Sequence, residues 1–99
     1  MILRAIKEEL AACDKPVAKI IKSGSNYNLL AVGLKKGVTW QDHKTAMPTK
    51  LIVIEGSVIY QENGGKVPLM IYDEFEIPVN IIHSLEAAED SLCMLIRGE

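Results

Sequence analysis

Residues 51–69 read LIVIEGSVIYQENGGKVPL, and this stretch decides the fold class. It contains three short apolar runs rich in β-branched residues, a composition typical of β-strands. Glu55-Gly56 separates the first run from the second, and Asn63-Gly64-Gly65 separates the second from the third. Asparagine and glycine tolerate the positive φ angles of tight hairpin turns. The stretch therefore predicts consecutive antiparallel strands.

The same succession of apolar runs and turn signals extends over most of the chain. Nine strands are predicted with no helical segment between them, which excludes parallel βαβ architecture and favours an antiparallel sandwich or barrel. Closing the sheet into a barrel would also remove its exposed edges. The predicted strands are Val17–Lys22, Tyr27–Leu34, Val38–Gln41, Leu51–Ile54, Ser57–Gln61, Lys66–Leu69, Phe75–Ile77, Ile82–Ala87 and Leu92–Arg97.

The segment from Ile2 to Ala12 has a different pattern. It carries apolar residues at helical spacing, with lysine and glutamate between them. Pro16 ends this pattern, because proline disfavours helical geometry in the residue before it. We predict a single domain over residues 1–99, with a short helix or arm at 1–16 and a β-barrel at 17–97.

Composition excludes several function classes. The chain has 99 residues, 48% of them hydrophobic, and a net charge of -2. Its lysines and arginines are scattered, so we expect no nucleic-acid partner. Charges interrupt the first twelve residues, so we expect no membrane span and no secretion signal, and we predict a cytoplasmic protein. Cys13 and Cys93 lack a nearby partner cysteine, so both are expected to be reduced, with Cys93 buried.

Two stretches resemble the paired sequence signatures of the cupin superfamily. The first is GVTWQDH at 37–43, closed by Gly56, and the second is IPVNIIH at 77–83. In this resemblance His43 and His83 fall on metal-ligand positions. Three residues depart from the second signature, where the family has two glycines and an asparagine: Tyr72, Asn80 and Ala87. The resemblance covers about residues 37–96 and implies a double-stranded β-helix, or jelly-roll barrel, that is commonly a homodimer.

The first signature also departs from the family at its remaining ligand positions. Thr45 stands at the second histidine and Thr49 at the glutamate, so two of the family's four usual ligands remain. Threonine is a poor metal ligand at neutral pH, whereas zinc and iron sites usually have three protein ligands. Three readings of the histidine pair stay open. It holds a divalent transition metal (zinc, iron, nickel or manganese), it is hydrogen-bonded inside the barrel, or it contacts a ligand and transfers protons.

Side-chain alternation along the strands predicts the lining of a cavity. If His43 points inward, Gln41 and Thr45 share its face, while Trp40 faces outward as a packing or dimer-interface residue. Counting from Thr49 carries Leu51 inward. The predicted lining is largely apolar with a few polar groups, as in small-molecule pockets. The predicted ligand-binding residues are Gln41, His43, Thr45, Met47, Thr49, His83 and Met94.

Three functions are consistent with these residues. The missing metal ligands and the apolar lining favour a small-molecule-binding barrel without a tightly held metal. The alternative is a metal-dependent enzyme of the dioxygenase or isomerase type that uses His43 and His83 as ligands. A third is a non-catalytic homodimerisation module, because burial between subunits would supplement a small core.

Overall fold

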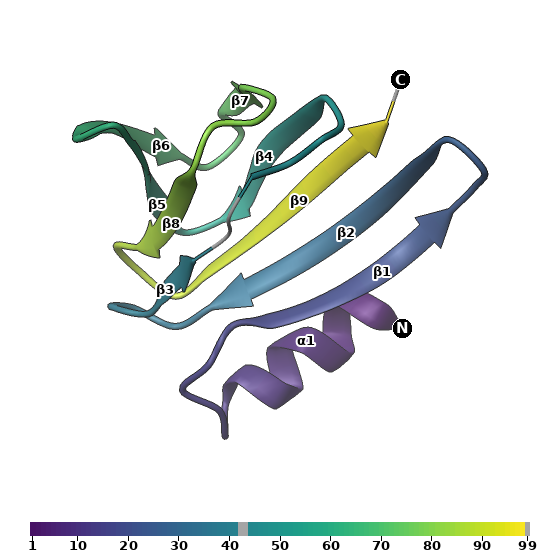
Figure 1. Cartoon of the computed structure of the whole chain (residues 1–99). Helices are drawn as coiled ribbons and strands as arrows, with labels where there is room; N and C mark the ends of the chain where they lie inside the picture. The colour runs from purple at the N-terminus through teal and green to yellow at the C-terminus, as the bar shows by residue number, and fades with distance from the viewer. Residues whose placement is uncertain (42–43, 99) are drawn as a thin grey trace.

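The computed structural model describes residues 1–41 and 44–98 (Figure 1). Within these residues one helix precedes nine strands, so every predicted strand is confirmed, with ends that move by two residues or fewer. The helix is α1 (Ile2–Leu10). The strands are β1 (Val17–Ser23), β2 (Tyr27–Leu34), β3 (Thr39–Gln41), β4 (Thr49–Glu55), β5 (Ser57–Glu62), β6 (Gly65–Met70), β7 (Glu74–Ile77), β8 (His83–Ala87) and β9 (Ser91–Gly98).

The strands form two antiparallel sheets that face each other (Figure 1). The larger sheet has the order β1-β2-β9-β4-β7 and the smaller has the order β3-β8-β5-β6. Neighbours such as β9 and β4 are far apart in sequence, which is the crossed connectivity of a jelly roll. The predicted all-β fold with a short N-terminal helix is confirmed.

The main core lies between the two sheets. It is made of side chains that point inward at every second position, such as Leu51 and Val53 on β4 and Val58 and Tyr60 on β5. Each of these four side chains is at most 1% exposed. The predicted inward face of β4 is therefore confirmed.

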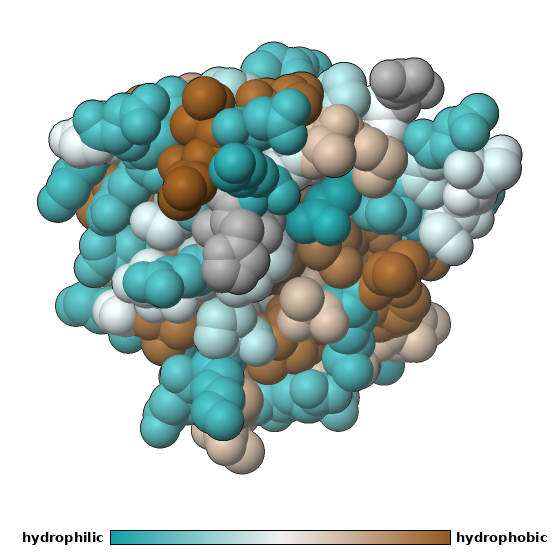
Figure 2. All heavy atoms as spheres, viewed as in Figure 1, coloured by the Kyte–Doolittle hydropathy of each residue, from teal (hydrophilic) through white to brown (hydrophobic). Residues whose placement is uncertain are grey.

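Helix α1 covers part of the outer face of the larger sheet (Figure 1). Ile6 and Leu10 pack there against Ala31 and Leu92. The contact is close, because a Cβ added to Gly33 would lie 2.6 Å from a methyl group of Ile6. No helix in the described part of the chain is both long and apolar enough to span a bilayer. The side shown in Figure 2 is largely hydrophilic, with hydrophobic patches between the polar side chains.

Positive φ angles occur at the turns that the sequence marks. Asn63 and Gly64 have φ of 48° and 79° in the β5–β6 turn, which is the conformation of a type I′ hairpin. Tyr72 and Asn80 have φ of 73° and 61°. Both stand where the family signature has a glycine, so the left-handed backbone is kept although the residue has changed.

The two cysteines should differ sharply in reactivity. Cys93 is fully buried in the core, and burial raises its pKa to about 12. Cys13 is half-buried after α1, and both thiols are free. Because the thiolate is the reactive form, we expect a disulfide reagent such as DTNB to label about one thiol per folded chain and the second only in denaturant. Labelling of Cys13→Ser should then be slow, whereas rapid labelling of that variant would contradict a closed core around Cys93.

Candidate functional site

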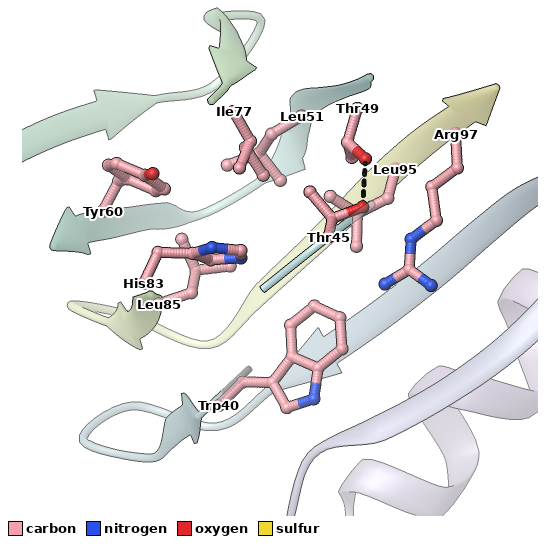
Figure 3. Close-up of a pocket in the computed structure, with 10 residues that line it drawn as sticks. All are labelled: Trp40, Thr45, Thr49, Leu51, Tyr60, Ile77, His83, Leu85, Leu95 and Arg97. Carbon is pink, nitrogen blue, oxygen red and sulfur yellow. Dashed lines mark hydrogen bonds between the residues drawn. The ribbon is translucent and has the colours of Figure 1, made fainter. Parts of the chain in front are cut away.

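A pocket opens between the two sheets (Figure 3). Four aliphatic side chains are part of its wall, and Trp40 lies at one side. The aliphatic residues are Leu51, Ile77, Leu85 and Leu95. They come from four different strands of both sheets, so the pocket depends on the closing of the barrel and on no single segment.

The pocket is narrow. The space between its walls is about 350 Å³ when the part open to solvent is included, but only about 10 Å³ of it can take the centre of a water molecule. The first volume describes the whole crevice and the second describes the room left for an occupant. One water needs roughly 10–15 Å³ on the second measure. As it stands, the pocket therefore holds about one water, and a larger occupant requires side chains at its edge to move.

His83 supplies an imidazole to the pocket from the start of β8. It is 7% exposed, as its predicted inward facing requires. Its Nδ1 lies 3.0 Å from the carbonyl oxygen of Ile81, and because a carbonyl can only accept, Nδ1–H is the donor. The neutral ring then has its acceptor nitrogen at Nε2. Such a backbone bond fixes both the tautomer and the orientation of the ring.

Tyr60 packs against His83 and reaches a carboxylate. The two rings are stacked with centroids 5.6 Å apart. The Tyr60 hydroxyl donates to Glu62 at 2.5 Å. Burial, followed by the hydrogen bond and the negative charge of Glu62, raises the pKa of Tyr60 well above its ordinary value. Tyr60 therefore keeps its proton at neutral pH and acts as a donor.

Glu62 is a site residue that the sequence reasoning missed. It is the Cα partner of His83 in the pairing of β5 with β8, so the two side chains project from the same face of the sheet. The signal in the sequence was that Glu62 lies two residues after Tyr60 in the same predicted run, just before the predicted hairpin turn. Without the strand pairing, nothing in the sequence placed this carboxylate beside His83.

The two threonines at the signature positions form a hydrogen-bonded cluster. Their hydroxyl oxygens lie 3.2 Å apart (Figure 3). The Thr45 hydroxyl donates to the Met47 carbonyl at 2.9 Å, and the Thr49 hydroxyl donates to the same oxygen at 3.0 Å. Each hydroxyl has a single proton, so at most two of these three contacts are donated by the hydroxyls at one time. Both residues line the pocket as predicted, and Thr49 is 3% exposed.

Arg97 brings a charged side chain to the pocket from the end of β9. It is the Cα partner of Thr49 on β4, and its guanidinium lies on the side of the pocket near the threonines and Trp40 (Figure 3). The sequence reasoning missed Arg97 as well. The signal in the sequence was that Arg97 lies two residues after Leu95 on the same strand, and Leu95 also lines the pocket.

The predicted facing of β3 is wrong. Trp40 lines the pocket, and Gln41 instead lines a neighbouring groove with Gln61 and Ser84. His83 borders both the pocket and this groove. The register explains the difference, because Trp40 pairs with the buried Leu85 while Gln41 pairs with Ser84. The prediction was counted back from residue 43, which lies outside the described residues. Trp40 is therefore not the outer-face residue that alternation predicted.

The two methionines predicted as cavity walls are also placed differently. Met94 lies on the outer face of the larger sheet, beside the start of α1. Met47 is not among the described residues that line the pocket, and it contributes its carbonyl oxygen to the threonine cluster. The prediction for His43 falls outside the described residues.

The described residues do not by themselves fit a metal centre. No three His, Cys, Asp or Glu side chains gather in a way that could hold an ion within residues 1–41 and 44–98. At the two substituted ligand positions, the hydroxyl protons of Thr45 and Thr49 are directed to a backbone carbonyl. Neutral hydroxyls of this kind are weak ligands compared with imidazole or carboxylate.

Neither a family model nor a curated protein matches the sequence. Solved structures do match the fold. A cupin-2 domain protein from Shewanella frigidimarina is 18% identical with a TM-score of 0.74, and the match covers 94% of this chain and 90% of that one. An RmlC-like cupin from Desulfovibrio desulfuricans is 15% identical with a TM-score of 0.77, covering 85% and 82%.

A third similar structure is a salicylate 1,2-dioxygenase variant from Pseudoaminobacter salicylatoxidans in complex with gentisate. It is 18% identical with a TM-score of 0.85, and the match covers 96% of this chain but 31% of that one. The resemblance that the two sequence signatures indicated thus extends to the arrangement of the strands. This chain has the double-stranded β-helix fold of the small RmlC-like cupins.

Proposed function

We propose that this chain binds a small organic molecule between its two sheets without a tightly held catalytic metal. The make-up of the pocket wall carries the proposal. Aliphatic side chains and Trp40 lie around a few polar groups, which come from His83, Thr45, Thr49, Tyr60 and Arg97. Small-molecule sites are commonly built in this way, with apolar walls for affinity and few polar atoms for orientation.

The chemistry at the two substituted positions supports the part of the proposal that concerns metal. A carboxylate and an imidazole are the side chains that bind transition metals at such positions, whereas neutral hydroxyls bind them weakly. Thr45 and Thr49 need no cation, because their hydroxyls have hydrogen-bond partners in each other and in the Met47 carbonyl. The threonine cluster is therefore stable without an ion.

A metal-dependent enzyme of the dioxygenase or isomerase type is the second candidate. Two observations favour it: the bond from His83 to Ile81 presents Nε2 as the acceptor nitrogen, and one chain of similar fold is a dioxygenase. Metal analysis separates the two candidates. We expect protein purified without a histidine tag to hold far less than one transition-metal ion per chain. The content should be the same in a His43→Ala, His83→Ala double variant. About one ion per chain in the wild type that the double variant loses would overturn the metal-free proposal.

Ligand binding is tested with Trp40, the only tryptophan of the chain and a pocket residue. We expect some compounds of a small-molecule library to change its fluorescence saturably. Leu85→Phe, which fills the pocket, should abolish this change, whereas Ile59→Phe on the neighbouring strand should keep it. Circular dichroism checks that both variants fold, because overpacking costs about 1–3 kcal/mol. A response that survives in Leu85→Phe, or no saturable response to any compound, would contradict binding in this pocket.

A further inference from the structure

Tyr72, in the turn between β6 and β7, has an unusual backbone for its residue type. Of the non-glycine residues with positive φ in the described part of the chain, Asn63 and Asn80 are asparagines, which tolerate the left-handed conformation. Tyr72 has φ of 73°, and its bulky side chain makes this conformation strained. A glycine at this position would avoid the strain.

The Tyr72 side chain makes no contact inside the chain that would offset this strain. It is 77% exposed. Within the described residues its ring stacks on no other ring, and its hydroxyl has no hydrogen-bond partner. Strained residues cluster at functional sites, and an exposed ring is available to a second molecule.

The turn that carries Tyr72 is apolar and firmly held. Met70 and Ile71 come just before it and are 66% and 44% exposed, so three large apolar residues follow one another at the surface. Tyr72 N–H donates to the Val53 carbonyl at 2.7 Å, and Val53 N–H donates to the Asp73 carbonyl at 3.1 Å. Met70 N–H donates to the Asp73 carboxylate at 2.8 Å. A surface that is ordered in advance loses little conformational entropy on binding.

Carboxylates border this apolar turn. Met70 and Ile71 line an open depression together with Glu89 and Asp90, which belong to the β8–β9 turn. Lys36 lines the depression as well. The described lining therefore holds two carboxylates and one ammonium group, which leaves an excess of negative charge.

No cation of the chain neutralises Glu89 or Asp90. Glu89 accepts a hydrogen bond from the Ser57 hydroxyl at 3.0 Å, and Asp90 accepts one from the backbone N–H of Lys36 at 2.9 Å. Both donors are neutral groups. Within residues 1–41 and 44–98 neither carboxylate forms an ion pair. A partner that brings a basic side chain to the depression would therefore meet complementary charge.

We propose that Met70, Ile71 and Tyr72, with Glu89 and Asp90, form a docking surface for another protein that presents a lysine or arginine beside an aliphatic patch. Tyr72 is the anchor of this surface, because tyrosine is common among the residues that dominate binding at protein interfaces. The docking surface and the pocket between the sheets share no described lining residue. The inference therefore does not depend on the proposed function.

The experiment selects peptides from a random phage-displayed library on the folded wild-type protein. We expect the enriched peptides to carry lysine or arginine next to apolar residues. Fluorescence polarisation should show at least about tenfold weaker binding of these peptides to Tyr72→Gly, as for an anchor residue. A Glu89→Gln, Asp90→Asn double variant should also bind them more weakly, and its affinity should depend less on salt. Ile82→Ser removes a different side chain that is 67% exposed, and it should leave the affinity unchanged.

Urea denaturation separates a docking role of Tyr72 from a structural one. Because glycine relieves the strain, Tyr72→Gly should unfold at a higher urea concentration than the wild type while it binds the peptides more weakly. Tyr72→Ala keeps the strain, so it should unfold near the wild-type urea concentration and bind as weakly as Tyr72→Gly. Unfolding of Tyr72→Gly at a lower urea concentration would show that the ring stabilises the fold, and it would overturn the proposal.

Three further results would also overturn the proposal. The first is that no peptide, or only acidic peptides, is enriched on the wild type. The second is that the enriched peptides bind Tyr72→Gly as tightly as the wild type. The third concerns a second copy of the chain as the occupant. If analytical ultracentrifugation over a dilution series shows self-association that Tyr72→Gly abolishes, the surface joins two copies instead of binding a basic partner.

Discussion

Gly56→Ala is expected to lower the free energy of unfolding by about 3–5 kcal/mol, close to the limit that single substitutions reach. Gly56 has φ of 78° in the turn between β4 and β5, where a residue with a side chain is strained. A Cβ there would also lie 2.3 Å from the carbonyl oxygen of Asp90 and 2.9 Å from the Cα of Ser91. Both are backbone atoms, so no rotamer change relieves the clash.

Gly64→Ala is the matched control for this prediction. Gly64 has nearly the same φ, 79°, but no atom lies within 4 Å of the position of an added Cβ. Only the left-handed strain remains, and we expect a loss of about 1–2 kcal/mol. Urea denaturation measures both variants. Equal losses of unfolding free energy in the two variants would show that the close contact of Gly56 with the β8–β9 turn does not contribute to the effect.

Leu51→Ala is expected to have the second large effect, a loss of about 2–4 kcal/mol in the free energy of unfolding. Leu51 is 1% exposed in the main core, and its removal leaves a cavity that the sheets can only partly close. Ile52→Ala on the same strand is the control. Ile52 is half-buried on the outer face, so its truncation should cost clearly less.

The same substitution should change the preference of the pocket for ligand size. Leu51 lines the pocket and Ile52 does not, so only Leu51→Ala creates room beside Trp40 and Tyr60. Among the compounds that change Trp40 fluorescence, we expect the larger ones to gain affinity relative to the smaller ones in Leu51→Ala, and we expect the preference of the wild type in Ile52→Ala. An unchanged preference in both variants would mean that ligands bind elsewhere on the barrel.

The amino-acid sequence by itself determined the strands and where most of them end. Turn residues such as Asn63-Gly64 act locally, and short β-branched runs between them leave few alternatives to antiparallel strands. Within an unbroken strand, alternation also fixed the inward face, which is why Thr49, Leu51 and His83 lie where they were predicted. These features depend on neighbours close along the chain.

Only the tertiary structure decided which residues meet in the pocket. Trp40 and Gln41 exchanged faces relative to the prediction, because the pairing of β3 with β8 sets Trp40 opposite the buried Leu85. Strand β9 is apolar on both faces, because the core covers one face and α1 covers part of the other. Hydrophobicity along its sequence therefore does not tell whether Met94 or Leu95 faces the core. Arg97 and Thr49, like Glu62 and His83, meet through pairings between distant strands. Their positions follow from the closing of the barrel, which no local pattern contains.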